Sequence, residues 1–317
     1  MGASDLPVVA VCIPVNQIKE RAARTLRGRC EVVTTGYDGI DGLTKDEKAV
    51  VVGLLIGSGT RVGAQLLDGF PHLRVVSTWS IGVDHIDLQE TRARGIVVAN
   101  APNRADALAE IVLALMLSLS RKLPEAMAAV SSNAWSKPPV GTDLRGKRLF
   151  IVGFGNTGRA VATAAQAFGM EISFFDARAD IAGMRGAKQE GNLESGLRCA
   201  DWVSLHVDLN PTTFHMMDAR SIALMKPTAY LINTSRGAVV DQQGLAAALA
   251  SGAIAGAGLD VLEREPPDPD DPILRNRNVV VTPHIGFATQ EVWEDMIDCA
   301  VGNLLACLYG EPCEYVL

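Results

Sequence analysis

Three residues that could act together on a polar substrate follow short apolar segments in the second half of the chain. They are Arg236, Glu265 and His284. A guanidinium keeps its charge at any working pH, and its planar fork fits a carboxylate. Reduction of a ketone requires a proton for the developing alkoxide, and an imidazole with a pKa of about 6.5 is a natural donor. A carboxylate within hydrogen-bond reach would orient the ring and raise its pKa, so the three residues predict acid–base chemistry on a 2-keto acid.

Each of these residues also has a simpler explanation. Arg236 alone could form an ordinary salt bridge, and a lone histidine such as His284 is more often a satisfied core or surface residue. Glu263 competes with Glu265 as the partner of the imidazole. Strand alternation cannot choose between the two carboxylates, because residues two apart point to the same side of an extended segment. At the level of the residues alone, that choice stays open.

A glycine-rich segment, GFGNTG at positions 153–158, joins an apolar strand to a helix. Gly153 permits a tight turn, Gly155 lets the backbone approach a pyrophosphate, and Gly158 lets helix and strand pack closely. Asn156 and Thr157 open the helix, whose free N–H groups and positive dipole end favour a phosphate. In this context of strand, loop and helix the segment predicts a dinucleotide site. Hydride transfer to a 2-keto acid is the reaction that such a site and the three residues above would serve together.

Asp176 stands at the end of the next apolar strand. A carboxylate there would accept hydrogen bonds from the adenosine ribose hydroxyls and would repel a 2′-phosphate. The sequence therefore predicts NAD(H) rather than NADP(H). Arg178, two residues further on, could still attract a phosphate.

The composition excludes several other classes of protein. The chain has 317 residues, 48% of them hydrophobic, and a formal net charge of −7. This length favours two domains, and the negative charge argues against nucleic acid or an anionic membrane as a partner. No apolar run approaches the roughly 20 residues of a membrane span, and the N-terminus does not resemble a signal peptide. The six cysteines lack the spacing of metal or redox sites, so we expect reduced thiols, no metal and a cytoplasmic location.

Apolar segments rich in β-branched residues alternate with helical patterns along the whole chain. The first group of predicted strands is Val8–Ile13, Val32–Thr35, Val50–Ile56, Leu73–Thr78 and Ile96–Ala99. The second group is Arg148–Val152, Glu171–Phe175, Trp202–His206, Ala229–Asn233, Ala255–Leu259 and Val279–Val281. Such alternation predicts an α/β fold with two Rossmann-like, doubly wound parallel sheets.

Two longer helices define how the domains divide. Ala105–Leu123 is apolar almost all round, which is typical of a buried helix at a domain junction or a dimer interface, and we expect it to end near Pro124. Thr289–Tyr309 is expected to return to the first domain and make it discontinuous. The predicted substrate domain, flavodoxin-like, is 1–100 with 288–317, and the predicted NAD-binding domain is 101–287.

At its motifs the chain resembles the D-2-hydroxyacid dehydrogenase family over essentially its whole length. The matching segments are 153–158 with 176, 233–237 with 240–241, 258–261 through 265–266, and 283–286. The resemblance implies NAD as the cofactor, with hydride moved between the nicotinamide and C2 of the substrate. It implies that Arg236 binds the substrate carboxylate and that His284 is the acid/base. Glu265, directly before proline as in the family pattern, is then its partner.

The resemblance also implies two groups of binding residues. The loop Ser80–Asp84 matches a segment of the first domain in which the backbone N–H groups of Ile81 and Gly82 would bind the substrate carboxylate. The family often has a glycine where Ser80 or Ile81 stands, so the detailed shape of this loop is not implied. Four further positions match residues that lie beside the cofactor: His206, Thr234, Asp260 and Gly286.

The sequence thus predicts a cytoplasmic, NAD-dependent homodimeric enzyme that interconverts a 2-keto acid and a D-2-hydroxy acid in a cleft between its domains. Glyoxylate and hydroxypyruvate are candidate substrates, but the side chain of the substrate is not predicted. One alternative is a 3-phosphoglycerate dehydrogenase without a regulatory domain, which the segment 201–241 resembles. Another is an NAD-sensing binding protein like the transcriptional corepressors that share this fold and triad.

Overall fold

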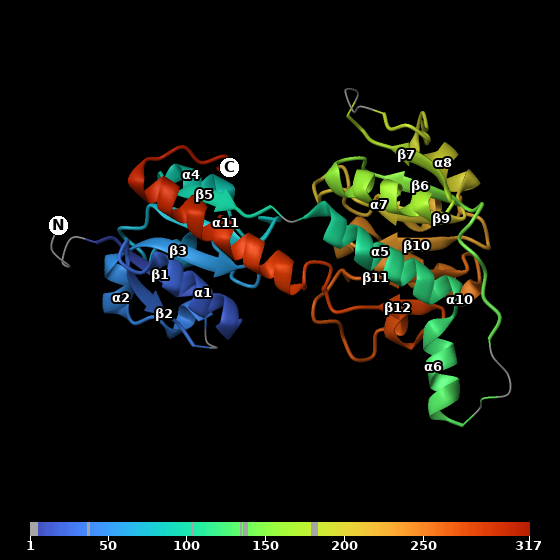
Figure 1. Cartoon of the computed structure of the whole chain (residues 1–317), viewed down its shortest axis with the longest axis horizontal. Helices are drawn as coiled ribbons and strands as arrows, with labels where there is room; N and C mark the ends of the chain where they lie inside the picture. The colour runs from blue at the N-terminus through green and yellow to red at the C-terminus, as the bar shows by residue number, and fades with distance from the viewer. Residues whose placement is uncertain (1–5, 37–38, 103, 134, 136–138, 179–182) are drawn as a thin grey trace. The chain divides into compact units, whose positions relative to one another are not determined.

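A computed structural model describes residues 6–36, 39–102, 104–133, 135, 139–178 and 183–317 of the protein. The chain divides into two compact units. Unit 1 consists of Met1–Arg104 and Ala288–Leu317, and unit 2 is Ala105–Phe287. Each unit is built on its own parallel β-sheet (Figure 1). The predicted α/β fold with two parallel-sheet domains is confirmed, and so is the discontinuity of the first.

The sheet of unit 1 has five parallel strands in the order β2-β1-β3-β4-β5. Their bounds are β1 Val8–Cys12, β2 Glu31–Thr34, β3 Val51–Gly57, β4 Val75–Trp79 and β5 Val97–Asn100. The central strands β3 and β4 are buried along almost their whole length. Burial on both faces explains why these strands are continuous apolar runs in the sequence rather than alternating ones.

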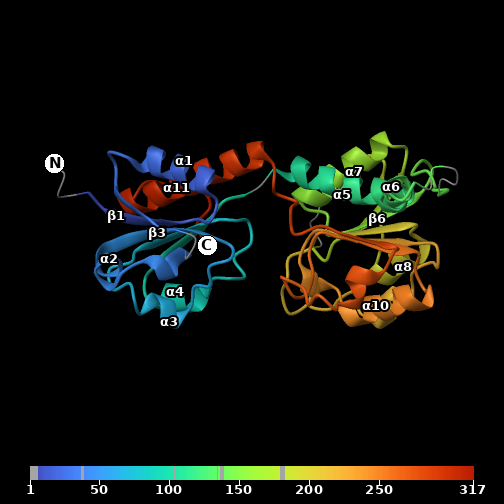
Figure 2. The same cartoon turned by 90° about the horizontal axis from the view of Figure 1, so that it is seen from below.

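Helices cover both faces of this sheet (Figure 2). α1 (Asn16–Leu26) and α11 (Gln290–Tyr309) lie on one face. α2 (Lys45–Val50), α3 (Ala64–Leu67) and α4 (Leu88–Ala93) lie on the other, together with the 3-10 turn Gly39–Gly42. This is the three-layer arrangement expected when parallel strands are joined by crossover helices.

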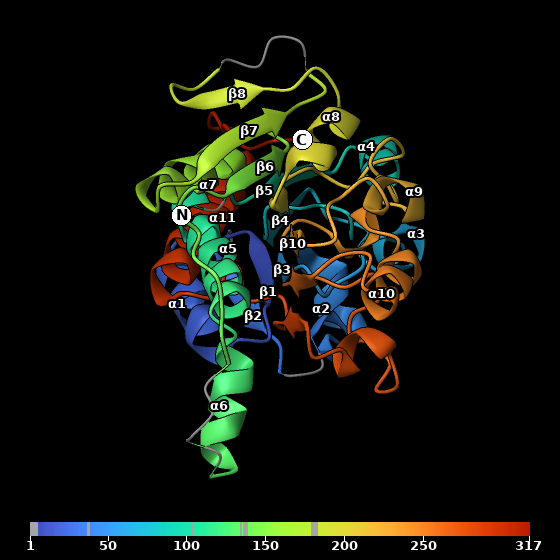
Figure 3. The ribbon, with the colours of Figure 1, turned by 90° about the vertical axis from the view of Figure 1, so that its right-hand side faces the viewer.

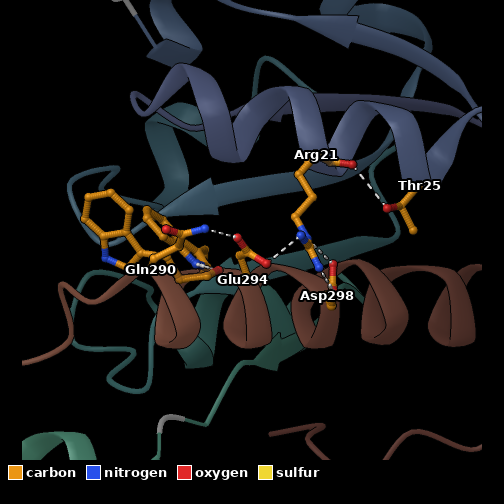
Figure 4. Close-up of polar contacts among 7 residues, drawn as sticks. Arg21, Thr25, Gln290, Glu294 and Asp298 are labelled. Carbon is orange, nitrogen blue, oxygen red and sulfur yellow. Dashed lines mark hydrogen bonds and ion pairs between the residues drawn. The ribbon is translucent and has the colours of Figure 1, made fainter.

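The C-terminal helix α11 belongs to unit 1 because polar and apolar contacts fix it there. Arg21 of α1 donates two hydrogen bonds to Asp298, at 2.9 and 2.7 Å, and one to Glu294 at 2.8 Å (Figure 4). The hydroxyl of Ser77 in β4 donates to the carbonyl of Ala300, 2.8 Å away. These bonds hold a segment from the end of the chain against strands formed by its first hundred residues.

The last residues of the chain continue this attachment along the sheet edge. Asn100 N donates to the carbonyl of Tyr315, and Leu317 N donates to the carbonyl of Val98. Ala99 and Val316 form an antiparallel bridge. The tail therefore pairs with β5, which would otherwise be an open edge strand.

The sheet of unit 2 has seven parallel strands in the order β12-β11-β10-β9-β6-β7-β8. Their bounds are β6 Arg148–Val152, β7 Glu171–Phe175, β8 Ala187–Gln189, β9 Trp202–Leu205, β10 Tyr230–Asn233, β11 Gly256–Leu259 and β12 Val279–Val281. Six of these strands were predicted. β8 was not, because it is a three-residue edge strand of mostly polar, exposed residues without an apolar pattern.

Two hydrophobic clusters fill the space between this sheet and its helices. Leu149 and Ile151 of β6 face the cluster under α5 (Ala105–Ser120) and α7 (Asn156–Ala167). Phe150 and Val152 alternate to the other face. That face is covered by α8 (Leu193–Cys199), α9 (Ala219–Ile222) and α10 (Gln242–Ser251) (Figure 3). Two 3-10 turns of unit 2 span Gly237–Val239 and Pro272–Arg275.

The prediction that one helix runs from Ala105 to Leu123 and stops near Pro124 is wrong. α5 ends at Ser120, Lys122 takes a left-handed conformation with φ 50°, and a second helix, α6 (Leu123–Ser131), follows. Pro124 lies in the first turn of α6, where a missing N–H group costs nothing because the helix has no acceptor for it. α6 extends away from the rest of unit 2 and buries none of its residues (Figure 3).

Within the described ranges, every helix is too short or too polar to cross a lipid bilayer. All six cysteines carry free thiols. Burial raises the pKa of the Cys12 thiol to about 11, which keeps it protonated and unreactive.

We expect Arg21→Ala to lower the free energy of unfolding by about 0.5–1 kcal/mol at neutral pH, as is typical of half-exposed ion pairs. The hydrogen bond from Arg21 lowers the pKa of Asp298, so this stabilisation is complete above the unfolded value of about 3.9 and is lost as the pH falls through the lower folded value. Urea unfolding at pH 7 and pH 3 measures the difference, which should shrink in acid. Arg24→Ala is the control, because Arg24 is exposed on the same helix and takes part in no described ion pair.

Candidate active site

The functional segments of unit 2 all follow the carboxyl ends of parallel strands. The glycine-rich loop follows β6, the Arg236 segment follows β10, the Glu265 segment follows β11 and the His284 segment follows β12. Parallel strands present their carboxyl ends at one edge of the sheet, and ligands of open α/β sheets bind outside that edge.

Two of the three glycines in the 153–158 loop are required by its geometry. Gly153 has φ +88°, and a Cβ there would lie 2.2 Å from the carbonyl oxygen of His206. A Cβ on Gly158 would lie 2.2 Å from the carbonyl oxygen of Gly153. At Gly155, in contrast, the nearest atom to an added Cβ is Arg178 Nη2 at 3.7 Å. The first and third glycines permit close packing, and the second leaves the loop surface open to a ligand.

Two groups at this edge of the sheet make no hydrogen bond among the described residues. A bound dinucleotide could supply a hydrogen-bond partner for each. Helix α7 starts at Asn156, and no side chain caps its first N–H groups, which have no acceptor within the helix. The hydroxyl of Thr234, at the end of β10, is buried and makes no hydrogen bond within the described part of the chain. An open glycine loop, an uncapped helix start that includes Thr157 and an orphaned hydroxyl fit a phosphate-bearing ligand that spans this edge of the sheet.

Asp176, at the end of β7, is tied to both the loop and a cation. Its carboxylate accepts from Phe154 N at 2.8 Å and from Arg178 Nε and Nη2 at 3.0 Å each. The hydrogen bond from the Arg178 side chain is the largest of the effects that lower the pKa of Asp176 to about 2, so the carboxylate is ionised at any working pH. Asp176 thus holds the Arg178 guanidinium beside the glycine loop, and its contact with a ribose remains a prediction.

Arg236 lies in a loop that Asn233 shapes. Asn233 Oδ1 accepts from the N–H of Ser235 at 3.0 Å and from its hydroxyl at 2.8 Å, while Asn233 Nδ2 donates to the carbonyl of Arg236 at 2.9 Å. Gly237 lets the next loop approach, because a Cβ there would lie 1.9 Å from the carbonyl oxygen of Leu262. Asn233 was not among the predicted site residues. An asparagine at a strand end, where such side chains form turns, was the available signal.

Glu265 and His284 form a hydrogen-bonded pair. Glu265 Oε2 lies 2.8 Å from His284 Nδ1, and Glu265 Oε1 accepts from Leu262 N at 3.0 Å. Partial burial disfavours the charged carboxylate, but these two hydrogen bonds and the nearby charge of Arg236 lower the pKa of Glu265 overall. The pair leaves His284 Nε2 on the opposite side of the ring for a reacting group. Loops after three different strands thus bring a cation, a carboxylate and an imidazole together.

Glu263, the competing carboxylate, pairs with a different histidine. Its Oε1 lies 2.9 Å from His215 Nε2, and its backbone N–H donates to Gln242 Oε1 at 2.9 Å. The ring of Phe214 stacks on His215 at a centroid distance of 4.0 Å. Glu263 therefore fastens the loop that carries Glu265 to the start of α10 and to the 214–216 segment. The sequence pattern gave no signal for this second pair.

Asp260 holds the turn that presents the imidazole. It is 2% exposed, and its carboxylate accepts from the Thr282 hydroxyl at 2.5 Å, from Ile285 N at 2.9 Å and from Gly286 N at 2.8 Å. Its carbonyl oxygen accepts from the N–H of His284, a residue with φ 54°. A Cβ on Gly286 would lie 3.0 Å from Asp260 Oδ2, which explains the glycine. These bonds orient His284, and a contact between Asp260 and the cofactor remains a prediction.

His206 follows β9 beside the glycine loop. Its Nε2 lies 2.8 Å from the hydroxyl of Ser204. Burial lowers the pKa of His206 to about 4, so the ring is neutral at physiological pH. A neutral ring adds no charge next to the glycine loop. A contact between His206 and the nicotinamide half of the cofactor remains a prediction.

The two predicted carboxylate-binding residues of the first domain, Ile81 and Gly82, lie in unit 1 after β4. Ile81 is 42% exposed, and its carbonyl accepts a hydrogen bond of 2.7 Å from Asn100 Nδ2. No hydrogen bond among the described residues uses the N–H group of either residue. In the same described ranges, no group of three histidine, cysteine, aspartate or glutamate side chains could hold a metal ion.

The chain is similar to a family of known enzymes. The family model "D-isomer specific 2-hydroxyacid dehydrogenase, NAD binding domain" matches residues 113–286. A glyoxylate reductase from Thermococcus litoralis is 41% identical over 290 residues, which is 85% of this chain and 87% of that protein. A D-3-phosphoglycerate dehydrogenase from Methanocaldococcus jannaschii is 35% identical over 298 residues, or 92% of this chain but 55% of that protein.

A solved structure supports the same relationship. The NADPH-dependent glyoxylate/hydroxypyruvate reductase from Sinorhizobium meliloti, in complex with NADP and malonate, superposes with a TM-score of 0.88 at 29% identity and covers 98% of this chain and 96% of its own. The glycine loop and the His284 segment lie within the residues that the family model matches. The chain therefore belongs to the D-isomer specific 2-hydroxyacid dehydrogenase family of NAD(P)-dependent enzymes.

Proposed function

We propose that this enzyme reduces small 2-keto acids to D-2-hydroxy acids with NADH, and catalyses the reverse reaction. The observation that carries the proposal is the hydrogen bond of 2.8 Å between His284 Nδ1 and Glu265 Oε2, in a cluster whose third member is Arg236. Glyoxylate and hydroxypyruvate are the first substrates to test, because the relatives named above include reductases of these acids.

The side chains divide the work as follows. Arg236 binds the substrate carboxylate through its guanidinium fork and polarises the adjacent carbonyl. The N–H groups of Ile81 and Gly82 in unit 1 are also proposed as donors to a substrate carboxylate. His284 donates a proton from Nε2 to the developing alkoxide, while Glu265 fixes the orientation of the ring through Nδ1. In the oxidative direction the neutral ring accepts the proton.

A bound nicotinamide dinucleotide would supply the hydride for reduction or accept it in oxidation. The loop of Gly153, Gly155 and Gly158 and the first N–H groups of α7 are proposed to hold its pyrophosphate, and Asp176 to accept from the adenosine ribose. On the nicotinamide side we propose contacts from four residues: His206, Thr234, Asp260 and Gly286.

A 3-phosphoglycerate dehydrogenase activity is the second candidate. The Methanocaldococcus jannaschii relative favours it, and this chain spans about half the length of that protein. NADH oxidation with glyoxylate, hydroxypyruvate, pyruvate, phenylpyruvate and 3-phosphohydroxypyruvate would rank the substrates. Tight NADH binding without turnover of any of them would instead support an NAD-sensing protein.

We further propose a cytoplasmic homodimer. Helix α6 exposes apolar side chains, among them Met127 at 69% and Val130 at 54%, and Trp135 is 80% exposed. Exposed apolar surface of this extent marks an interaction site, and a second copy of the chain is the proposed partner. Free thiols at all six cysteines suit a reducing compartment. The mass in solution, measured by light scattering, tests the dimer.

Cofactor choice is the first property to measure. We expect kcat/KM with NADH to exceed that with NADPH by at least about tenfold, or about 1.4 kcal/mol, because the ionised Asp176 repels a 2′-phosphate. Asp176→Ser should weaken this discrimination, since it removes the carboxylate that repels the 2′-phosphate. Equal use of both cofactors by the unaltered enzyme would contradict the assignment.

Arg236→Lys keeps the positive charge but loses the planar fork. We expect KM for the keto acid to rise and kcat to fall, with little change in NADH affinity measured by fluorescence titration. Near-normal kcat/KM in this variant would show that Arg236 has a structural role instead.

Glu265→Gln keeps the size of the side chain and removes its charge. Reduction consumes a proton from His284, so reductive kcat/KM should fall as the pH rises and the ring loses that proton. The hydrogen bond and charge of His284 lower the pKa of Glu265. Glu265→Gln removes the charged partner in this interaction, so the alkaline limb should move to lower pH. Oxidation of the hydroxy acid, which needs the neutral ring, should extend to lower pH than before.

Glu263→Gln is the matched control for this substitution. Glu263 contacts His215 rather than His284, so both limbs of the pH profiles should stay in place. A limb that moves in Glu263→Gln but not in Glu265→Gln would mean that the wrong carboxylate has been assigned.

A further inference from the structure

The loop after β4 in unit 1 has three consecutive peptide groups, each fixed by a hydrogen bond to its carbonyl oxygen. The carbonyl of Ser80 accepts from Ala101 N at 3.0 Å. The carbonyl of Ile81 accepts from Asn100 Nδ2 at 2.7 Å, and the carbonyl of Gly82 accepts from the Ser80 hydroxyl at 2.8 Å. A main-chain donor and two side-chain donors thus fix three successive carbonyls.

Fixing these carbonyls also fixes the N–H groups on the other side of each peptide. A trans peptide is planar, and its N–H points opposite to its C=O. The directions of the N–H groups of Ile81, Gly82 and Val83 are therefore set by the three bonds above. None of these N–H groups donates a hydrogen bond among the described residues. Adjacent N–H groups held in place without an acceptor form a site for a carboxylate oxygen.

The donation from Ser80 to Gly82 sets the direction of two neighbouring hydrogen bonds. Ser80 Oγ lies 2.8 Å from Thr78 Oγ1, and Thr78 Oγ1 lies 3.1 Å from His85 Nε2. A hydroxyl has one proton to donate. If Ser80 donates to Gly82, Thr78 must donate to Ser80, and His85 Nε2 must donate to Thr78. Thr78, the middle member of this row, is fully buried.

Asn100 is held from two sides by the C-terminal part of unit 1. Asn303 Nδ2 of α11 donates to the carbonyl of Asn100 at 2.9 Å, and Asn100 N donates to the carbonyl of Tyr315. The backbone on both sides of the Asn100 side chain is thereby fixed, which directs its amide toward Ile81.

We propose that Ser80 and Asn100 are positioning residues for the substrate carboxylate. They act through the peptide groups of residues 80–83, and they set the direction of the N–H groups of Ile81 and Gly82. This inference rests on the proposed function for the role of those N–H groups, and it adds a reason why this chain has a hydroxyl side chain at position 80.

A hydroxyl that merely stabilised β4 would behave differently from a positioning residue. Ser77 offers the comparison, because its hydroxyl also leaves β4 and is bonded, but to the carbonyl of Ala300 in α11. Ser77→Ala removes a buried hydrogen bond from the same strand without touching the 80–83 loop. It should lower the melting temperature and leave the kinetics unchanged.

Ser80→Ala should raise KM for glyoxylate three- to tenfold, change kcat by less than twofold and leave the Kd for NADH unchanged. Ser80→Thr, which keeps the hydroxyl, should stay within twofold of the unaltered enzyme. Asn100→Ala should raise KM in the same way, and this variant tests the proposal if Ser80→Ala does not fold. Unchanged KM in both Ser80→Ala and Asn100→Ala, or an equal rise in Ser77→Ala, would overturn the proposal.

An independent readout separates this inference from the proposed function. Oxalate titrated into the isotope-labelled full chain should shift the amide resonances of Ile81 and Gly82, with an affinity three- to tenfold weaker in Ser80→Ala. If the unaltered enzyme reduces no 2-keto acid but these amides still respond to oxalate in this way, the positioning role stands and the proposed function fails. If 2-keto acids are reduced and these amides do not respond, the positioning role fails alone.

Discussion

The parallel alignment of the strands in unit 2 is the constraint on which the candidate site depends. β6, β9, β10, β11 and β12 run in the same direction, so their carboxyl ends meet at one edge of the sheet. The segments that follow them are far apart in the sequence, yet the sheet brings the ends of β10, β11 and β12 next to one another. An arginine, a carboxylate and an imidazole can then form one cluster, because each needs only a short loop to reach that edge.

The candidate site also depends on the close approach of backbone segments to one another. At Gly153, Gly158 and Gly237 a Cβ would lie within about 2 Å of a carbonyl oxygen, and at Gly237 that oxygen belongs to the loop that leads to Glu265. Any side chain at these positions would force the loops apart. Arg236 and the Glu265 segment can therefore lie close together because Gly237 has no side chain.

Polar side chains at the strand ends mostly orient backbone rather than contact solvent. Asn233 shapes the Arg236 loop, Asp260 holds the turn with His284, and Ser80 with Asn100 fixes the loop after β4. Each of these side chains makes hydrogen bonds to peptide groups, and these bonds fix the conformation of the loop. These residues therefore support the loops that carry Arg236, His284, Ile81 and Gly82.

The sequence by itself determined the alternation of strands and helices, the glycine loop, the long C-terminal helix and the residue types suited to the chemistry. These follow from local patterns, because apolar runs, glycine spacing and strand ends are properties of neighbouring residues. Tertiary structure decided the rest. Glu263 and Glu265 are equivalent in an extended segment, and only the packing of loops after different strands pairs one with His215 and the other with His284. The short strand β8 likewise depends on its pairing with β7, and the bond from Asn100 to Ile81 joins residues that no local pattern brings together.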